Sequence, residues 1–461
     1  MSTNQETPHS LQRNLKNRHL QLIAIGGAIG TGLFMGSGKT IHLAGPSVIL
    51  AYIIIGAFLF FIMRAMGELL LSNLEYKSFT DFTHDLLGPA AGFFVGWTYW
   101  FCWVVIGMAD IIAITGYTQF WWPDVPLWLP GLLCIILMAG MNLLTVKLFG
   151  EMEFWFALVK IVAIVALIAV GCFLVASGFV DPTSGEKASL SHFWNHGGFF
   201  SAFQIAVFAF VGIELVGTAA AETKDPEVNL PKAINRIPMR VIIFYVLALS
   251  VIMVVTPWNE IDPAKSPFVN MFTLIGIPIA AGLVNLVVLT SALSSANGGM
   301  FSTGRMLYGL SEAGVAPRMF SRLNRNGVPA TGLLYSCLYL IVAVFLLYQE
   351  GDIMAMFTVV TTLSSIGFIF VWAIILLAYL KYRKTCPHLH EKSIYKLPGG
   401  TAMVWVCLAF LAFVLVLFSR DADTRLGLMC MPIWFAACTV LYWLLYHRKH
   451  SNNPAPQQSQ Q

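Results

Sequence analysis

Charged side chains are scarce in this sequence. Only 11% of its 461 residues are Asp, Glu, Lys or Arg, whereas a soluble domain has about 25%. A soluble protein of this length needs more charge to cover its surface, so a cytosolic enzyme, a secreted enzyme and a nucleic-acid-binding protein are all disfavoured. Apolar residues make up 57% of the chain, and about 20 of them suffice for one spanning helix. The composition therefore predicts an integral membrane protein with the lipid bilayer as its partner.

Paired cysteines and catalytic motifs are also lacking. The eight cysteines include no CxxC pair, so neither a disulfide framework nor a zinc site is indicated. No P-loop, HExxH or nucleophile-elbow motif is present, and we predict no enzyme, no metal site and no cofactor. His388 and His390 lie in a basic loop without further ligands, and we expect them to be solvated. A cleaved signal peptide is not expected, because the polar, basic N-terminus leads into a series of apolar runs.

Long apolar runs separated by short polar stretches mark the expected membrane spans. We predict twelve of them, at residues 20–42, 46–66, 89–118, 127–146, 154–178, 200–221, 240–257, 276–298, 333–348, 354–380, 402–419 and 427–446.

The distribution of Lys and Arg predicts the orientation. Twelve spans place both termini on one side, and 21 Lys and Arg residues fall on that side against five on the other, with Lys160 inside a span. Basic loops stay in the cytoplasm, so both termini are predicted to be cytoplasmic. Within the cytoplasmic loop 222–239, a short surface helix is expected after Pro231, and the polar tail after His450 is expected to be disordered.

Glycines crowd the middle of the first span, in the run IAIGGAIGTGLFMGSG. Each glycine weakens a helix interior by about 1 kcal/mol relative to alanine. Close helix packing explains the GxxxG spacing of Gly26 and Gly30, but it explains Gly30-Thr31-Gly32 poorly, so an unwound hinge fits better. The sixth span has Gly212 at its middle, and two interrupted helices in corresponding positions point to a transporter site.

Such breaks suit a zwitterionic amino acid. Exposed N–H groups at a half-helix N-terminus favour a carboxylate, and exposed carbonyls favour an ammonium group. We expect Gly30, Thr31 and Gly32 to bind the carboxylate. The amine is expected to bind carbonyls of these residues: Ala28, Ile29, Phe208, Ala209 and Val211.

Three strongly ionisable residues fall well within the expected spans. They are Asp110, Lys160 and Glu214, and a charge at the bilayer centre costs about 2.5–3.5 kcal/mol on insertion scales. Lys160 either snorkels to the interface or replaces a coupling ion, and Glu214 either makes a structural hydrogen bond or acts as a gate or proton relay. Asp110 has the weakest functional claim, because it could face a wet vestibule or lie nearer the outer interface.

Several runs carry a family resemblance. IGGAIGTGLFMGSGKTI, ELLLSNLEYKSF, GEMEFWFALVK, FAFVGIELVG and AAETKDP occur in this order. They are similar to those of the amino acid transporter family of the amino acid–polyamine–organocation superfamily, and the likeness runs from about Leu11 to the end of the twelfth span.

The resemblance implies an all-α fold with five-plus-five inverted repeats, discontinuous helices 1 and 6, and two additional helices. It divides the chain into a cytoplasmic tail (1–19), a transport core (20–380), a cytoplasmic loop (381–401), helices 11 and 12 (402–446) and a second cytoplasmic tail (447–461).

The resemblance also implies a function. This is proton-driven uptake of small neutral amino acids across the bacterial inner membrane, with D-serine, D-alanine, glycine and D-cycloserine as candidate substrates. An exchanger or permease for larger neutral or cationic amino acids, and a membrane sensor or channel, are the alternatives.

The family motifs assign roles to individual residues. The G-[ST]-G motif matches Gly30, Thr31 and Gly32, and the F-x-G-x-E motif matches Phe210, Gly212 and Glu214. Lys160 matches a lysine that replaces a sodium ion in sodium-independent relatives. By looser alignment, Met300 and Ser364 approach the pocket.

Overall fold

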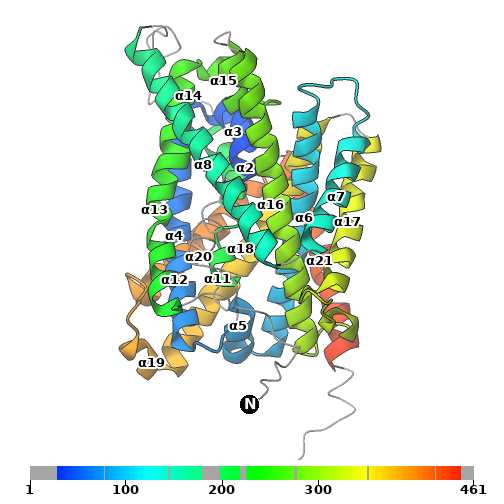
Figure 1. Ribbon diagram of the computed structural model, residues 1–461. Coiled ribbons are helices and arrows are strands. Elements are labelled where there is room, and N and C mark those ends of the chain that lie inside the picture. Colours follow the sequence, from blue (N-terminus) through cyan, green and yellow to red (C-terminus); the bar gives the residue numbers. More distant parts are fainter. Residues whose placement is uncertain are drawn as a thin grey trace, which may run out of the picture.

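The structure is a computed structural model that describes residues 29–76, 78–143, 146–178, 198–218, 225–274, 278–349, 352–420 and 422–447. All regular elements in these ranges are helices. The long helices stand side by side in one bundle, with the short helices α5 (Phe79–Leu87) and α19 (Pro387–Lys392) at one end (Figure 1). An all-α architecture is therefore confirmed for the described part of the chain.

Nine helices in the described ranges are long and apolar enough to cross a membrane. They include α6 (Pro89–Thr118), α8 (Val146–Ala176), α16 (Pro278–Glu312), α17 (Ala330–Gln349), α18 (Ile353–Thr385), α20 (Gly400–Phe418) and α21 (Ala422–Tyr442). The other two are continuous stretches: one joins α3 (Gly36–Ala44) to α4 (Val48–Ser72), and one runs from α12 (Pro226–Asn235) to α14 (Ala248–Val255).

Two shorter apolar helices complete the described bundle, namely α7 (Trp128–Leu143) and α10 (Gly198–Phe208). The α6 boundaries equal those expected from the sequence, and α17 extends the short ninth span to 20 residues. Residues 20–28 of the first predicted span lie outside the described residues. The count of twelve spans and the inverted repeat therefore remain predictions.

Local sequence signals explain where several helices begin. Ser78 caps α5 by accepting a hydrogen bond from Thr80 N, and the Asp81 carboxylate accepts one from Ser78 N at 3.2 Å, which completes a capping box. Pro89 opens α6 at a position where its missing N–H has no intrahelical role. The same preference places the start of α12 at Pro226. The expected start after Pro231 is therefore wrong, since Pro231 lies inside the helix.

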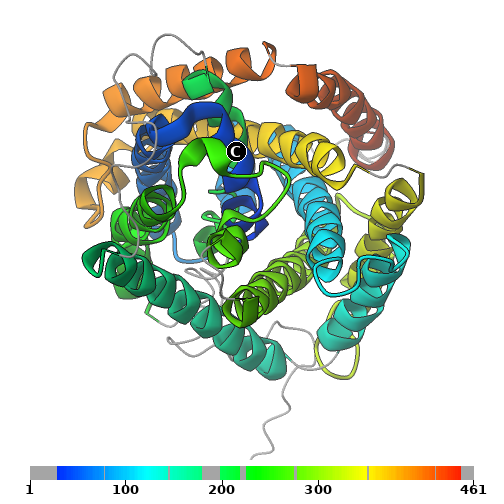
Figure 2. The ribbon, with the colours of Figure 1, turned by 90° about the horizontal axis from the view of Figure 1, so that it is seen from above.

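The helices α2 (Thr31–Phe34) and α3 lie inside the ring formed by the longer helices (Figure 2). Every residue of α2 is buried, and α6 packs along both α16 and α18. Large apolar side chains face outward instead, among them Ile136, Phe173, Ile279, Trp405 and Ile433. An apolar exterior around a partly polar interior is the arrangement that a lipid environment favours.

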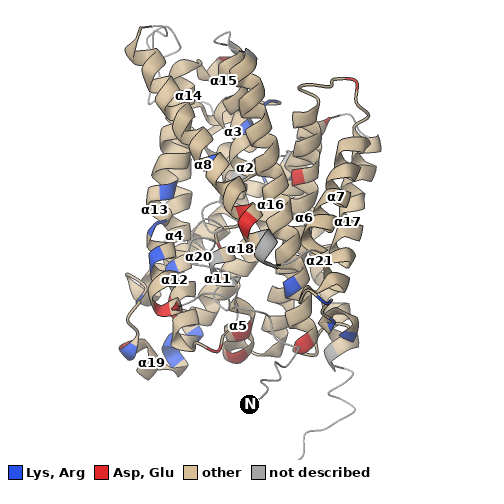
Figure 3. Cartoon of the chain, viewed as in Figure 1, with Lys and Arg blue, Asp and Glu red and all other residues tan. Residues whose placement is uncertain are grey.

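Charged residues concentrate at the end of the bundle that holds α5 and α19 (Figure 3). Few of the described Lys, Arg, Asp and Glu residues lie in its middle. The charges that do lie there are therefore the ones to examine for function, because each needs a partner in the bundle interior.

Candidate functional site

The predicted sixth span is interrupted near its middle. Helix α10 ends at Phe208, and α11 (Leu215–Thr218) begins only after six residues without α-helical structure. Gly212 takes a φ of +100° there, a conformation that residues with a Cβ atom rarely adopt. The Tyr245 hydroxyl donates a 2.6 Å hydrogen bond to the carbonyl of Ala209. The interruption is thus held by a specific turn residue and by a hydrogen bond from the neighbouring helix.

The glycine run of the first span meets this interruption directly. Gly30 is extended, and α2 begins at Thr31. A Cβ atom added at Gly32 would lie 2.6 Å from Ala209 Cα and 2.9 Å from an atom of the Phe208 ring. Only glycine lets the two backbones approach this closely. The structure therefore brings together the two segments that the sequence singled out separately.

The first N–H groups of a helix have no intrahelical acceptor, so α2 presents such groups beside the interruption. Ile29, just before this helix, has its carbonyl occupied by the Ser291 hydroxyl at 3.2 Å. Ala28, which we expected to contribute a carbonyl, lies outside the described residues. Three of the carbonyls predicted to bind an amine, those of Ile29, Phe208 and Ala209, thus already accept a hydrogen bond.

Asp110 on α6 lies at the same place. Its side chain is fully buried, and its Oδ1 accepts a 2.7 Å hydrogen bond from Thr31 Oγ1. Its Oδ2 makes no hydrogen bond of normal geometry within the described chain, although the Ser295 side chain also interacts with this carboxyl group. The expectation that Asp110 faces a wet vestibule is therefore wrong, while its depth in the membrane stays a prediction. The sequence could not reveal this contact, because Thr31 and Asp110 are 79 residues apart and meet only in the tertiary structure.

Lys160 on α8 is fully buried and interacts electrostatically with Glu153 and Asp110. Glu153 is itself buried, and its Oε1 accepts a 2.6 Å hydrogen bond from the Ser294 hydroxyl on α16. The idea that only three charges lie within the bundle is therefore incomplete. The spacing of seven residues between Glu153 and Lys160 was the missed signal, because it places both side chains on one helix face.

Glu214 is the last residue of the interruption and is fully buried. Its Oε2 accepts a 3.3 Å hydrogen bond from Gly212 N, whereas its Oε1 has no partner among the described residues. The carboxylate thus stabilises the turn around Gly212 and retains one unused acceptor.

The remaining candidate residues are buried but differ in what they touch. Phe208 packs edge-on against Phe357, beside Gly32. Phe210 instead stacks on Tyr245, with ring centroids 4.7 Å apart. Phe208 therefore lies at the junction of the two segments, while Phe210 packs the interruption against its scaffold.

Three further candidate positions pack between helices or in the interruption. Val211 is buried within the interruption. Met300 packs against Gly107 of α6, and Ser364 Oγ lies 3.5 Å from the carbonyl of Cys102 on the same helix. Within the described ranges, no group of three or more His, Cys, Asp and Glu residues is placed to hold a metal ion.

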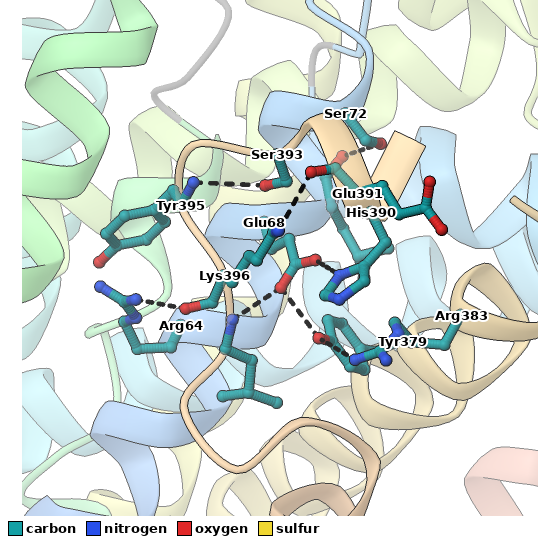
Figure 4. A network of polar contacts seen from close by, with 12 residues as sticks. Arg64, Glu68, Ser72, Tyr379, Arg383, His390, Glu391, Ser393, Tyr395 and Lys396 are labelled. Carbon is teal, nitrogen blue, oxygen red and sulfur yellow. Dashed lines mark hydrogen bonds and ion pairs between the residues drawn. The ribbon is translucent and has the colours of Figure 1, made fainter. Parts of the chain in front are cut away.

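A further buried carboxylate, that of Glu68, lies near the end that holds α19 (Figure 4). Glu68 on α4 accepts hydrogen bonds from Leu397 N at 2.7 Å and from the Tyr379 hydroxyl at 2.9 Å, and it pairs with His390 Nδ1 at 2.5 Å. The His390 side chain is only 18% exposed, so its expected solvation is wrong, while His388 is exposed as expected.

The architecture and the paired breaks define the class of protein: a multi-span helical membrane protein with a polar site in the bundle interior. The amino acid permease family model matches residues 19–454, and the chain belongs to this family.

Individual relatives agree with this assignment. The D-serine/D-alanine/glycine transporter of Escherichia coli strain K12 is 62% identical over 450 residues, which cover 96% of this chain and 95% of the relative. The amino-acid permease AapA of Bacillus subtilis is 52% identical over 95% of this chain and 96% of its own length. The probable threonine/serine transporter YbxG of the same species is 42% identical, with 94% and 95% covered.

These relatives are named as transporters and permeases, so the prediction that the chain is not an enzyme is confirmed. The runs GWTYWFCWVV, TSALSSANG and HLHEKSIYK also indicate similarity to a D-serine/D-alanine/glycine permease, and the 62% identity confirms that similarity.

Proposed function

We propose that this protein is a secondary active transporter that takes up small neutral amino acids together with protons by alternating access. Its substrates are D-serine, D-alanine and glycine, with D-cycloserine as a further candidate, and it resides in the bacterial inner membrane with both termini in the cytoplasm. The observation that carries the proposal is the contact between Gly32 and the backbone of Ala209, which joins two sequence-predicted breaks in the bundle interior. The name of the 62% identical relative supports the substrate class.

In this proposal the substrate carboxylate binds at Gly30, Thr31 and Gly32, where it accepts hydrogen bonds from backbone N–H groups and from the Thr31 hydroxyl, which Asp110 holds in the structure. The amine binds in the interruption of the sixth span, where a carbonyl has a second lone pair even when it already accepts one hydrogen bond. Phe208 forms an apolar wall at the same junction. An apolar wall of this kind favours a small neutral side chain over a charged one.

The buried charges provide the coupling. Lys160 occupies the position of a coupling cation. Glu214 accepts a hydrogen bond from Gly212 N, and this contact connects the carboxylate to the conformation of the interruption. Discrimination by one methylene is worth only about 1–3 kcal/mol, so we expect several small amino acids to share the site.

The test is uptake of radiolabelled D-alanine into proteoliposomes. With an imposed gradient that is acidic outside, the label should accumulate above its external concentration, and a protonophore should abolish this accumulation. Uptake that is indifferent to the gradient would exclude symport. Counterflow without net uptake would instead favour an exchanger, and a competition panel of D- and L-amino acids would establish the substrate range.

A further inference from the structure

We infer that Asp110 is the group at which the proton and the substrate meet: the substrate carboxylate binds at Thr31 when Asp110 has taken up the transported proton. This inference rests on the proposed function and names the residue that couples its two fluxes. No defined role for Asp110 follows from the sequence alone, so the assignment depends on the tertiary structure.

The first observation is a shared hydroxyl proton. A threonine hydroxyl has one proton to donate, and Thr31 donates it to Asp110 Oδ1 at 2.7 Å. A substrate carboxylate at Gly30, Thr31 and Gly32 needs the same proton. Asp110 and the substrate therefore compete for one donor.

The second observation is the unused oxygen of Asp110. The carboxyl group is fully buried, and Oδ2 makes no hydrogen bond of normal geometry within the described chain, although the Ser295 side chain also interacts with the carboxyl group. Two carboxylates that share a buried site cannot both stay ionised easily. A proton on Asp110 removes this repulsion and turns the side chain from an acceptor into a hydrogen-bond donor for the substrate.

The charges around Asp110 balance with one added proton. Lys160 on α8 acts electrostatically on Asp110, which in turn acts on Tyr117 of its own helix and on Cys134 of α7. Lys160 also interacts with Glu153, which the Ser294 hydroxyl holds in place. The Lys160 ammonium group balances one of the two carboxylates, Glu153 and Asp110. One added proton neutralises the other.

The step conserves charge and atoms. One proton from the outer solution binds to Asp110, no covalent bond of the substrate changes, and the zwitterion binds with its carboxylate at Thr31. After the site opens inward, the amino acid and the proton are released together. Asp110 then regains the Thr31 hydrogen bond seen in the structure.

The direct test is proton uptake on binding. Purified protein in weakly buffered detergent solution is mixed with D-alanine, and a pH dye records the protons bound. Wild-type protein should take up about one proton per D-alanine at a pH where Asp110 is ionised, and Asp110→Asn should take up none. Asp124→Asn is the matched control, because Asp124 is exposed in the loop after α6, and it should behave as wild type.

Proteoliposomes separate this inference from the proposed function. Asp110→Asn should fail to accumulate D-alanine against its gradient, and its counterflow rate should no longer vary with pH. Gradient-driven accumulation or undiminished proton uptake by Asp110→Asn would overturn the role of Asp110 and leave symport intact. Wild-type uptake without any response to the gradient would overturn the proposed function itself.

A wild-type measurement covers the case in which Asp110→Asn fails to fold. Competition between substrate and ionised Asp110 predicts that the affinity for D-alanine falls about tenfold per pH unit above the titration of this group. An affinity that stays constant between pH 5 and pH 9 would overturn the inference without any variant.

Discussion

At the scale of single residues, the site depends on two glycines, because a side chain at either position would not fit. Gly32 carries no Cβ, and this absence lets α2 rest against Ala209. Gly212 has no Cβ either, which allows the φ of +100° that turns the chain between α10 and α11. In the proposed mechanism the buried charged residues bind the proton, and the two glycines allow the close backbone approach and the turn that form the site.

Gly32→Ala should abolish uptake. The new Cβ would lie 2.6 Å from backbone that cannot move without opening the junction, so the two segments must separate. The measurement is D-alanine uptake normalised to the amount of protein in the membrane. Gly140→Ala is the control, because nothing lies within 4 Å of a Cβ at Gly140 in α7. Near-normal uptake by Gly32→Ala would contradict the proposed close approach.

Lys160→Ala should abolish gradient-driven uptake and lower thermal stability. Removing one partner of a buried charge pair costs about 3–5 kcal/mol, because Glu153 and Asp110 lose their shared cation. The double variant Lys160→Ala with Glu153→Gln should regain stability, since it removes one uncompensated carboxylate, but it should not regain coupling. Melting of the purified protein and proteoliposome uptake measure the two effects. If the double variant were no more stable than the single one, the pairing of Lys160 with Glu153 would be refuted.

At the scale of elements, the connection between α18 and α20 is fastened to α4. Glu68 binds three groups of this connection and of α18 (Figure 4). Arg64, one turn earlier on α4, donates a 3.1 Å hydrogen bond to the Asn235 side chain of α12, and Tyr395 donates to the same oxygen at 2.9 Å. Three elements that are far apart in sequence are therefore joined at this end of the bundle.

His390→Gln should lower the melting temperature of the purified protein, whereas His388→Gln should not. His390 contacts the buried Glu68 carboxylate, and a buried group that loses its hydrogen bond costs about 1–3 kcal/mol. His388, two residues earlier on α19, is exposed, so the pair forms a matched comparison. Equal melting temperatures for the two variants would show that the Glu68–His390 contact contributes nothing to stability.

At the scale of the whole molecule, charge and hydropathy decide how the bundle sits in a membrane. Nine described helices are long and apolar enough to span it, and charged residues gather at one end (Figure 3). Because basic loops are retained in the cytoplasm, the end with α19 is expected to face inward.

Single cysteines should report this orientation. Asp124→Cys and Glu391→Cys both replace exposed residues, at positions predicted to lie on opposite sides of the membrane. In intact cells a membrane-impermeant maleimide should add label at Asp124→Cys above the background of the native cysteines. Glu391→Cys should be labelled only after permeabilisation. The reverse pattern would invert the predicted topology.

The sequence by itself determined the class of protein, the all-helical architecture and the positions of most long helices. These follow from local properties, namely apolar runs of sufficient length and the glycines and prolines that begin or interrupt helices. The same local signals identified Gly30, Thr31, Gly32 and Gly212, because a residue without a Cβ marks an unusual backbone wherever it occurs in a helical run.

Only the tertiary structure decided which polar groups meet. The contacts of Thr31 with Asp110, Ser294 with Glu153 and Glu68 with His390 join residues between 79 and 322 positions apart. No local pattern encodes such pairs, since a buried charge selects its partner by proximity after the helices have packed. The sequence therefore identified charged residues within apolar spans, where burial of a charge is unfavourable. The packing of the bundle determined which group neutralises each of them.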